Sequence, residues 1–357
     1  MLKAVSHVVS LLFLSLFLTS WGTVGHKTIN SKCPDSFPAS MNSFKIWADS
    51  LGSNASNADN RKSSDNTESP KHFIDIDSYP EFNSTGRIPS TYDSIVSIHG
   101  SGYVINIGTL PWATLNMYDT LKVDFQKRKW HKAMLDASDL GHYVGDGHMP
   151  LHLATNYDGQ LTGQKGIHSR YETSMVGTYT SSLNTYSGTQ VQFVSNVNKY
   201  IFDYIYFDHQ YEDSVLVADS YAKNLTGSTI STEYYTALWS KAHFTTMLFK
   251  NASHALAELI YSAWVEAGSP AFGSKAITGI SNTPVNNISV YPNPCRGILS
   301  LIGDDIFKTE ISSAAGIKMG LYYSKSINLC HLSNGIYILS IFGKEGLLKK
   351  EKVMILK

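Results

Sequence analysis

The chain has 357 residues, of which 43% are hydrophobic, and its 29 Lys and Arg residues balance its 29 Asp and Glu residues. This length and apolar content suffice to bury one large core and one small core. The charge balance excludes a strongly basic protein that binds nucleic acid through its overall charge, although a metal cluster could still supply a local positive field. Three cysteines are too few for a disulfide framework. Cys295 and Cys330 could pair, which would leave Cys33 free.

An export signal is predicted at the start of the chain. Residues 1–20 contain a lysine near the front, then an apolar run, and they end in small residues. The run is too short to anchor the chain in a bilayer, so we interpret it as a signal peptide and expect an exported protein. Cleavage after this segment would make Trp21 the first residue, and its α-amino group and carbonyl could then chelate a metal ion. His26 could bind the same ion.

The polar segment 44–77 contains the next candidate ligands. Asp59 precedes His72 by thirteen residues, and Asn, Ser and Asp fill most of the gap, which indicates a polar loop between short helices. The run 71–77 alternates polar and apolar residues and is equally compatible with a short strand or a loop. Asp65, Asp75 and Asp77 compete with Asp59 as ligands, and spacing alone does not choose between them.

A helix from about residue 127 to residue 147 is predicted to carry two ligands. His142 and Asp146 stand four residues apart, so both side chains would project from one face and could share a metal ion. Pro150 is poorly tolerated inside a helix and should turn His152 towards the same pocket.

His168 and Glu172 repeat this four-residue spacing. Together with the preceding residues they make three imidazoles and two carboxylates, which suit zinc because it takes nitrogen and oxygen ligands. The alternative, in which these residues are capping or core-edge polar groups, would suit one such pair better than two. His148 is interpreted as a neighbour of the ligands rather than as a ligand.

Further helices are predicted on both sides of this region. Pro111 could begin a helix within 92–120, with Trp112 in the core. Apolar residues that recur near helical spacing from 232 to 267 predict two packed helices. Three further histidines are interpreted as surface or core residues, namely His209, His243 and His254.

The composition changes after residue 268. Ser, Gly, Asn, Thr and Pro are frequent up to residue 287, and we place a linker at 273–287. The following short β-rich runs, separated by turn residues, predict a small β-sandwich: Ile288–Tyr291, Ile298–Ile302 and Gly335–Phe342.

The ordered set of candidate ligands resembles that of the zinc-dependent phospholipase C family, which shares its fold and tri-zinc site with the fungal single-strand-specific nucleases. The set is Trp21, His26, Asp59, His72, His142, Asp146, His152, His168 and Glu172. The resemblance covers residues 21–272. The letters G-I-H-S-R-Y-E around Glu172 are more like the bacterial phospholipases, whereas W-G-T-V-G-H at Trp21 is more like the nucleases.

The resemblance implies an all-α catalytic domain at 21–272 with three zinc ions. Asp59, His72, His142 and Asp146 would hold one ion, His152, His168 and Glu172 a second, and Trp21 with His26 and the shared Asp146 a third. The implied reaction is hydrolysis of a phosphodiester by metal-bound hydroxide, with Asp59 also orienting the water as a base.

Phospholipid head groups at a membrane surface are the leading substrate by this resemblance. The alternative is single-stranded nucleic acid, for an endonuclease or 3'-nucleotidase of the same fold. A second alternative is a non-catalytic, zinc-stabilised surface module. A monomer is expected in each case.

The end of the chain, 288–357, resembles the C-terminal sorting domain of the type IX secretion system of Bacteroidetes-type bacteria. The resemblance rests on V-Y-P-N-P at 290–294, on L-S-N-G-I-Y-I-L at 332–339, and on the basic end with Lys349, Lys350, Lys352 and Lys357. It implies a secreted or cell-surface protein with the type IX machinery as a partner. The alternative is a carbohydrate-binding or adhesion β-domain. The predicted fold class is therefore mainly α, with a small C-terminal β-sandwich.

Overall fold

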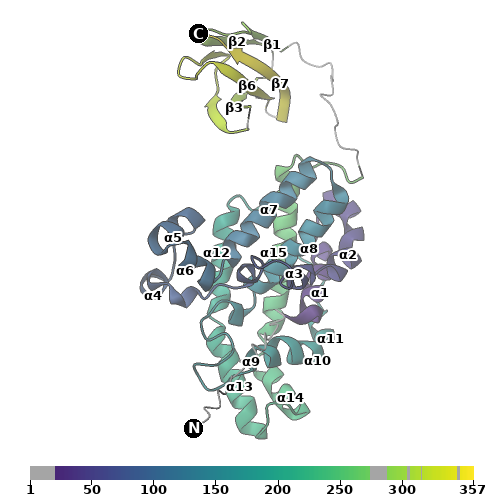
Figure 1. Cartoon of the computed structure of the whole chain (residues 1–357). Helices are drawn as coiled ribbons and strands as arrows, with labels where there is room; N and C mark the ends of the chain where they lie inside the picture. The colour runs from purple at the N-terminus through teal and green to yellow at the C-terminus, as the bar shows by residue number, and fades with distance from the viewer. Residues whose placement is uncertain (1–20, 274–287, 304–305, 315, 344–345) are drawn as a thin grey trace, which may run out of the picture. The chain divides into compact units, whose positions relative to one another are not determined.

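The structure is a computed structural model, and it describes residues 21–273, 288–303, 306–314, 316–343 and 346–357. The predicted signal peptide at 1–20 lies outside the described residues, as does nearly all of the predicted linker at 273–287. The chain divides into two compact units, Met1–Ala276 and Ile277–Lys357 (Figure 1). None of the described helices is long and apolar enough to cross a bilayer.

The first unit is built of helices. The longer ones are α1 (Gly22–Lys32), α7 (Leu110–Gln126), α8 (Trp130–Gly147), α12 (Val197–His209), α13 (Glu212–Thr226), α14 (Thr232–Lys241) and α15 (Thr245–Glu266). The short helices are α2 (Ala48–Ser53), α3 (Asn57–Arg61), α4 (Pro80–Thr85), α5 (Tyr92–His99), α6 (Ser101–Ile107), α9 (Ile167–Ser169), α10 (Val176–Thr178) and α11 (Thr180–Leu183). Between them lie 3-10 turns, of which η3 (Ser69–His72), η4 (Ile76–Ser78) and η5 (Pro150–His152) adjoin the site, and a π-helical turn, η6 (Arg170–Met175).

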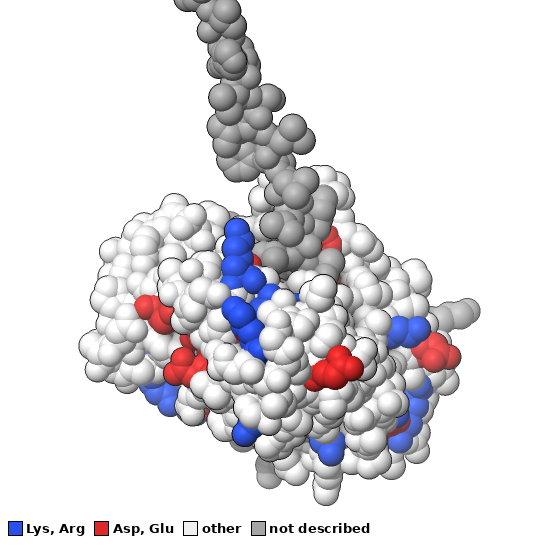
Figure 2. Space-filling view, turned by 90° about the horizontal axis from the view of Figure 1, so that it is seen from below, with Lys and Arg blue, Asp and Glu red and all other residues white. Residues whose placement is uncertain are grey.

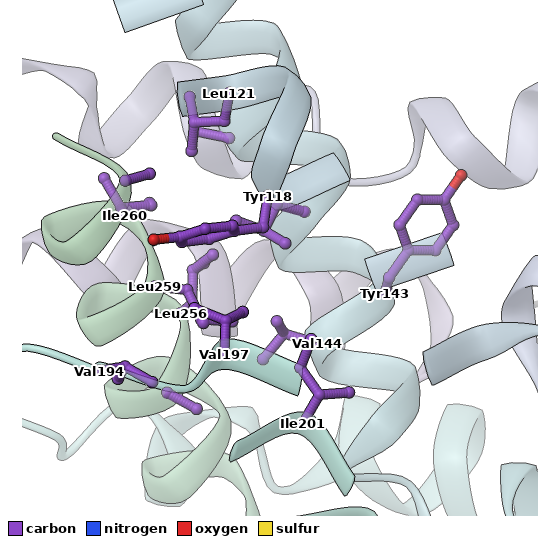
Figure 3. Packing of buried hydrophobic residues seen from close by; sticks show 14 of the residues in the cluster. Tyr118, Leu121, Tyr143, Val144, Val194, Val197, Ile201, Leu256, Leu259 and Ile260 are labelled. Carbon is purple, nitrogen blue, oxygen red and sulfur yellow. The ribbon is translucent and has the colours of Figure 1, made fainter. Parts of the chain in front are cut away.

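Helices α7, α8 and α15 pack against one another in the centre of this unit. Figure 3 shows Tyr118 of α7 and Val144 of α8 on the side that faces α15, where Leu256 and Leu259 lie. Burying a large aliphatic side chain of this kind stabilises the fold by about 1.5 to 3 kcal/mol. The core therefore fixes the rotation of α8 and with it the direction in which its polar residues point.

The predicted helices of the central region are confirmed. Helix α8 begins at Trp130 rather than near residue 127 and ends at Gly147. The 3-10 turn η5 then begins at Pro150, as the exclusion of proline from a helix interior requires. Helix α7 has Pro111 in its first turn, and Trp112 is buried. The two helices predicted between 232 and 267 are α14 and α15.

The run 71–77, which was compatible with a strand or a loop, forms two 3-10 turns, η3 and η4, joined by a short extended segment. The amides of Ile74 and Ile76 donate to the carbonyls of His152 and Leu153, at 2.9 and 3.2 Å. These bonds join the segment that follows η3 to the end of η5, so two segments that each carry a candidate ligand lie side by side.

The second unit is a β-sandwich of two antiparallel sheets. One has the order β1-β2-β5, with β1 (Ser289–Tyr291), β2 (Ile298–Ile302) and β5 (Ser326–Asn328). The other has the order β4-β3-β6-β7, with β3 (Lys308–Ser313), β4 (Lys318–Tyr322), β6 (Gly335–Gly343) and β7 (Gly346–Ile355). Leu299 and Leu301 of the first sheet share a core with Ile311, Leu339 and Val353 of the second.

The predicted fold class, mainly α with a small C-terminal β-sandwich, is confirmed. The three predicted strands correspond to β1, β2 and β6, whereas β3, β4, β5 and β7 were missed. Polar residues hide the apolar alternation of β3, K-T-E-I-S-S, and of β7, which has three lysines and a glutamate, whereas β4, K-M-G-L-Y, has no buried residue. Cys33 and Cys295 are buried and Cys330 is exposed, all three as free thiols, so the possible pair between Cys295 and Cys330 is not formed.

Candidate metal centre

Helix α8 provides the central pair of candidate ligands, His142 and Asp146, which are both fully buried. His142 Nε2 lies 3.4 Å from Asp146 Oδ2, as expected for residues one turn apart. Two glycines on α8 let α1 approach. A Cβ at Gly141 would lie 2.2 Å from Asn30 Oδ1, and one at Gly145 would lie 2.8 Å from His26 Nδ1. The close approach at Gly145 brings His26 to His142 and Asp146.

The first group of converging ligand atoms comes from Asp59, His72 and His142. His142 Nε2 lies 2.9 Å from His72 Nδ1, and Asp59 Oδ1 lies 3.5 and 3.6 Å from these two nitrogens. Asp59 is held on α3 and His72 on η3. His142 Nδ1 donates to the Ala55 carbonyl at 2.7 Å, so its Nε2 faces the group.

The three other aspartates that competed with Asp59 face elsewhere. Asp65 is bonded to the amide and hydroxyl of Thr67 on the surface. Asp77 accepts bonds from the amide and hydroxyl of Thr155. Asp75 lines the cavity described below. Of the four candidates, only Asp59 shares a group with His72 among the described residues.

The second group comes from His152, His168 and Glu172. The two Nε2 atoms lie 3.2 Å apart, and Glu172 Oε2 lies 3.5 Å from that of His152 and 3.3 Å from that of His168. Both Nδ1 atoms donate to carbonyls, that of His152 to His72 at 2.7 Å and that of His168 to Tyr157 at 2.9 Å. Because a carbonyl can only accept, each neutral imidazole then presents an Nε2 lone pair to the other. The two Nε2 lone pairs and the Glu172 carboxylate lie close together, and a cation bound between them would interact favourably with all three groups.

The third group comes from His26, His142 and Asp146. His26 Nε2 lies 3.4 Å from Asp146 Oδ1, and its ring stacks on that of His142 with 3.9 Å between centroids. Asp146 also lies 3.0 Å from His72 Nδ1 and 3.4 Å from His152 Nδ1. The Asp146 carboxylate therefore lies beside residues of all three groups, and His142 belongs to two of the groups.

Trp21 lies beside this third group. Its side chain is buried, the indole Nε1 donates to the Gly145 carbonyl at 2.6 Å, and the ring packs on Phe249 and Tyr171. The indole thus fixes residue 21 next to Asp146 on α8. A chelate through the Trp21 amine requires cleavage after residue 20, which lies outside the described residues, so this ligand stays a prediction.

The charges within the cluster shift several pKa values. Burial raises the pKa of Asp146, but the nearby His142 and His152 outweigh this and hold it well below its ordinary value. Burial lowers the pKa of His142, but the Asp146 and Asp59 charges raise it to about 9. Burial and the neighbouring His142 lower the pKa of His26. The cluster thus keeps its carboxylates ionised, as metal binding requires.

His148 points away from the three groups. Its Nδ1 donates to the Val144 carbonyl at 2.8 Å, its Nε2 lies 3.6 Å from Asp208 Oδ2, and its ring stacks on Tyr204 of α12. Burial lowers its pKa to about 4. His148 therefore packs α8 against α12. His254 of α15 likewise pairs with Glu258, at 3.2 Å.

Glu68 is a buried neighbour of the first group that the sequence reasoning missed. Its carboxylate accepts bonds from Tyr143 Oη at 2.5 Å and Lys71 Nζ at 2.8 Å, and its Oε1 lies 3.5 Å from His72 Nε2. Glu68 and His72 have the same four-residue spacing as the ligand pairs, and this spacing could have identified it. It holds the outer edge of the His72 ring.

A cavity of about 540 Å³ opens onto the first and second groups. Its lining residues are Lys62, Ser69, His72, Phe73, Asp75, Asn106, Leu151, His152, Tyr157 and His168. Lys62 Nζ lies 2.7 Å from Asp59 Oδ1, which brings a positive charge to the edge of the cluster. Burial and the neighbouring Asp77 raise the pKa of Asp75 to about 7.

Comparison with known proteins gives a match for the end of the chain. Residues 289–356 match the family described as the secretion system C-terminal sorting domain. The protein is therefore secreted or displayed on the cell surface through type IX secretion, and its tail interacts with that machinery. The predicted sorting domain is confirmed. No curated protein matches the chain.

Solved structures similar to this chain include two clostridial toxins. The alpha-toxin of Clostridium absonum is 11% identical with a TM-score of 0.45, over 93% of this chain and 96% of the toxin. The alpha-toxin of Clostridium perfringens from an avian strain is 11% identical with a TM-score of 0.45, over 94% of this chain and 95% of the toxin.

Proposed function

We propose that the helical unit is a secreted, zinc-dependent phosphodiesterase of the phospholipase C type. The observation that supports this most is the meeting of three His and carboxylate groups at Asp146, beside a cavity. The donors are imidazole nitrogens and carboxylate oxygens, which zinc prefers. We assign the catalytic domain to 21–272, the linker to 273–287 and the sorting domain to 288–357.

Each group would hold one zinc ion, with His142 as a ligand of the first ion because its Nδ1 is bonded to the Ala55 carbonyl and only its Nε2 is left to bind a metal. His26, Asp146 and the amine and carbonyl of the mature Trp21 would hold the third ion. When bound, zinc lowers the pKa of a water molecule and offsets negative charge on phosphoryl oxygens. The backbone carbonyls of Ala55, His72 and Tyr157 accept from the histidine Nδ1 atoms and so fix the tautomer that each ligand needs.

Asp59 is the proposed base. Burial raises the pKa of its carboxyl, but the His142 and Lys62 charges hold it well below its ordinary value, so it is ionised at neutral pH. Its side chain is 13% exposed, and it pairs with Lys62, which lines the cavity. Lys62 would attract the phosphate group to the same point, since a charge-assisted bond to a phosphate oxygen is strong.

The substrate proposed first is a phospholipid, with its head group in the cavity. Asp75 is half ionised near neutral pH, so it could pair with a cationic head group above pH 7. Figure 2 shows a run of adjoining basic residues near the middle of one face of the molecule, with separate acidic and basic residues around it.

A second candidate substrate is single-stranded nucleic acid. The observation that favours it is the pair of aromatic rings, Phe73 and Tyr157, in a cavity wall that also holds Asn106 and Asp75. Aromatic rings that stack on bases, beside groups that bond to base edges, are the usual means of recognising unpaired nucleotides.

A substrate panel tests the proposal. The protein that begins at Trp21 is loaded with zinc and assayed on phosphatidylcholine, phosphatidylethanolamine and phosphatidylserine micelles, on single-stranded DNA and RNA, and on 3'-nucleotides. We expect release of phosphorylated head groups that a chelator abolishes. Asp59→Asn should lower the rate by about 100-fold or more, whereas Asp65→Asn, on the exposed loop, should leave it unchanged.

The panel also separates the alternatives. Faster hydrolysis of nucleic acid than of any phospholipid would replace the first candidate with the second. A protein that binds zinc and hydrolyses none of these substrates would be a zinc-stabilised surface module instead of an enzyme.

A further inference from the structure

Arg170 occupies an unusual position between two candidate ligands of the second group. His168 lies on α9, and Glu172 lies on the π-helical turn η6 that begins at Arg170. Such π-turns are rare and are frequently found at functional sites. A turn with this geometry needs support from its surroundings, and Arg170 joins it to α13 and α14.

The Arg170 guanidinium is bound on three sides. Its Nη2 and Nε donate to Asp219 Oδ1 of α13, at 2.9 and 3.3 Å, and Nε also reaches the Tyr234 hydroxyl of α14, at 3.1 Å. Nη1 and Nη2 donate to the carbonyls of Lys165 and Gln164, at 3.0 and 3.1 Å. A guanidinium presents five N–H donors in a rigid planar fork and can serve these partners together, which the three donors of an ammonium cannot do.

Asp219 of α13 forms an ion pair with Arg170. Its side chain is fully buried, and besides Arg170 it accepts bonds from the Tyr234 hydroxyl and from Gln164 Nε2. The loop before His168 closes around the guanidinium at Gly166, whose φ is +90° and where a Cβ would lie 2.8 Å from Arg170 Nη1. The loop, η6 and the α13–α14 hairpin are thus tied together through one ion pair.

We propose that Arg170 and Asp219 position the second ligand group, His152, His168 and Glu172, for its metal ion. This inference rests on the proposed function, because it concerns the ion at that group. Removing one member of a buried pair leaves the other charge without its partner, which is costly. The strain would fall on η6, which carries Glu172, and on the loop that leads to His168.

The effect should be confined to one ion. The candidate ligands of the other two groups lie on α1, α3, η3 and α8. Within the described residues, the side chains of Arg170 and Asp219 bond to each other, to Gln164 and Lys165 in the loop before His168, and to Tyr234 of α14. A residue that only contributed to overall stability would weaken all three ions together. Selective loss of one ion is therefore the signature of a positioning role.

The test uses the full chain from Trp21 as wild type, Asp219→Asn and Arg170→Lys. Metal-free protein is titrated with Co²⁺, and the visible absorption of each binding phase is followed. Zinc retained after dialysis against a chelator is counted in parallel. We expect one binding phase to weaken by about tenfold or more in both variants, the range seen when a ligand's supporting residue is changed, while the other phases keep their affinity.

The matched control is Glu258→Gln on α15. Glu258 is also a buried carboxylate, and it accepts a tyrosine hydroxyl, that of Tyr200 at 2.6 Å, and the amide of Gln192 at 2.8 Å. This variant should lower the melting temperature as Asp219→Asn does and leave every Co²⁺ phase unchanged.

Unchanged Co²⁺ phases in Asp219→Asn and Arg170→Lys, or equal weakening of all phases, would overturn the positioning role while leaving the proposed enzyme intact. A wild-type protein that binds no metal would overturn the proposed function, and this inference with it.

Discussion

The change Asp146→Asn is the sharpest test of the proposed metal centre, because this carboxylate contacts ligands of all three groups. Its oxygens lie 3.0 Å from His72 Nδ1 and 3.4 Å from nitrogens of His26, His142 and His152. Asparagine keeps the shape of the side chain and removes its negative charge. The variant therefore isolates the contribution of that charge to metal binding.

The size of the effect follows from Coulomb's law. Two unit charges about 4 Å apart interact by about 4 kcal/mol at an effective dielectric constant of about 20. A divalent ion doubles this figure, and relaxation of the site together with the remaining amide oxygen recovers part of it. We expect a net loss of about 3 kcal/mol or more, which is at least about a hundredfold weaker binding.

The control is His148→Ala, because His148 is equally buried and lies two residues from Asp146 in sequence. The structure directs its ring to Tyr204 and Asp208. Its loss should cost about 2 to 4 kcal/mol of folding stability through a cavity in the core and should leave zinc binding unchanged. Zinc content by elemental analysis and thermal unfolding are measured on both variants. Equal zinc loss in the two would place His148 among the ligands and refute the assignment.

Three further predictions concern the whole chain. N-terminal sequencing of the secreted protein should find Trp21, and any other first residue would remove the amine chelate. A chain truncated after Phe272, which packs on Phe44, Trp47 and Trp130, should keep its activity and lose export; an inactive truncated protein would show that the sorting domain contributes to the site. The third concerns pH. Although burial lowers the pKa of His142, Asp146 and Asp59 raise it to about 9 in the metal-free fold. The protonated His142 stabilises the metal-free fold fully below about pH 6.5, the pKa of histidine in the unfolded chain, and this stabilisation is lost as the pH rises through 9. Zinc must displace the His142 proton, so it binds better as the pH rises. Melting temperatures with and without chelator should therefore diverge between pH 6 and 9, and parallel curves would contradict this.

Much of the candidate site could be predicted because its residues are paired locally. The His142–Asp146 and His168–Glu172 spacings and the break at Pro150 are short-range features, and helix geometry converts them into directions. The pairing of Asp59 with His72 could not be obtained in this way. Which aspartate reaches His72 depends on how α3 packs against α8, a contact between segments more than 60 residues apart.

The supporting residues were missed for a related reason. Asp219 and Tyr234 lie 49 and 64 residues from Arg170, and no spacing rule connects a buried ion pair across three elements. The roles of Gly141 and Gly145 could not be predicted either, because in the sequence alone a glycine only weakens a predicted helix. In the structure they are the places where α1 touches α8, and this contact brings His26 to Asp146.

The balanced composition of the chain is compatible with an anionic substrate once the charges are counted at the site. The proposed ligand set contains three carboxylates, Asp59, Asp146 and Glu172. Three zinc ions would carry six positive charges, so the loaded cluster would have an excess of three, with Lys62 beside it at the cavity. In a buried site such charges are screened much less than on the surface. A phosphate would therefore be attracted to the cavity by charge that appears nowhere in the amino-acid composition, because the ions supply it.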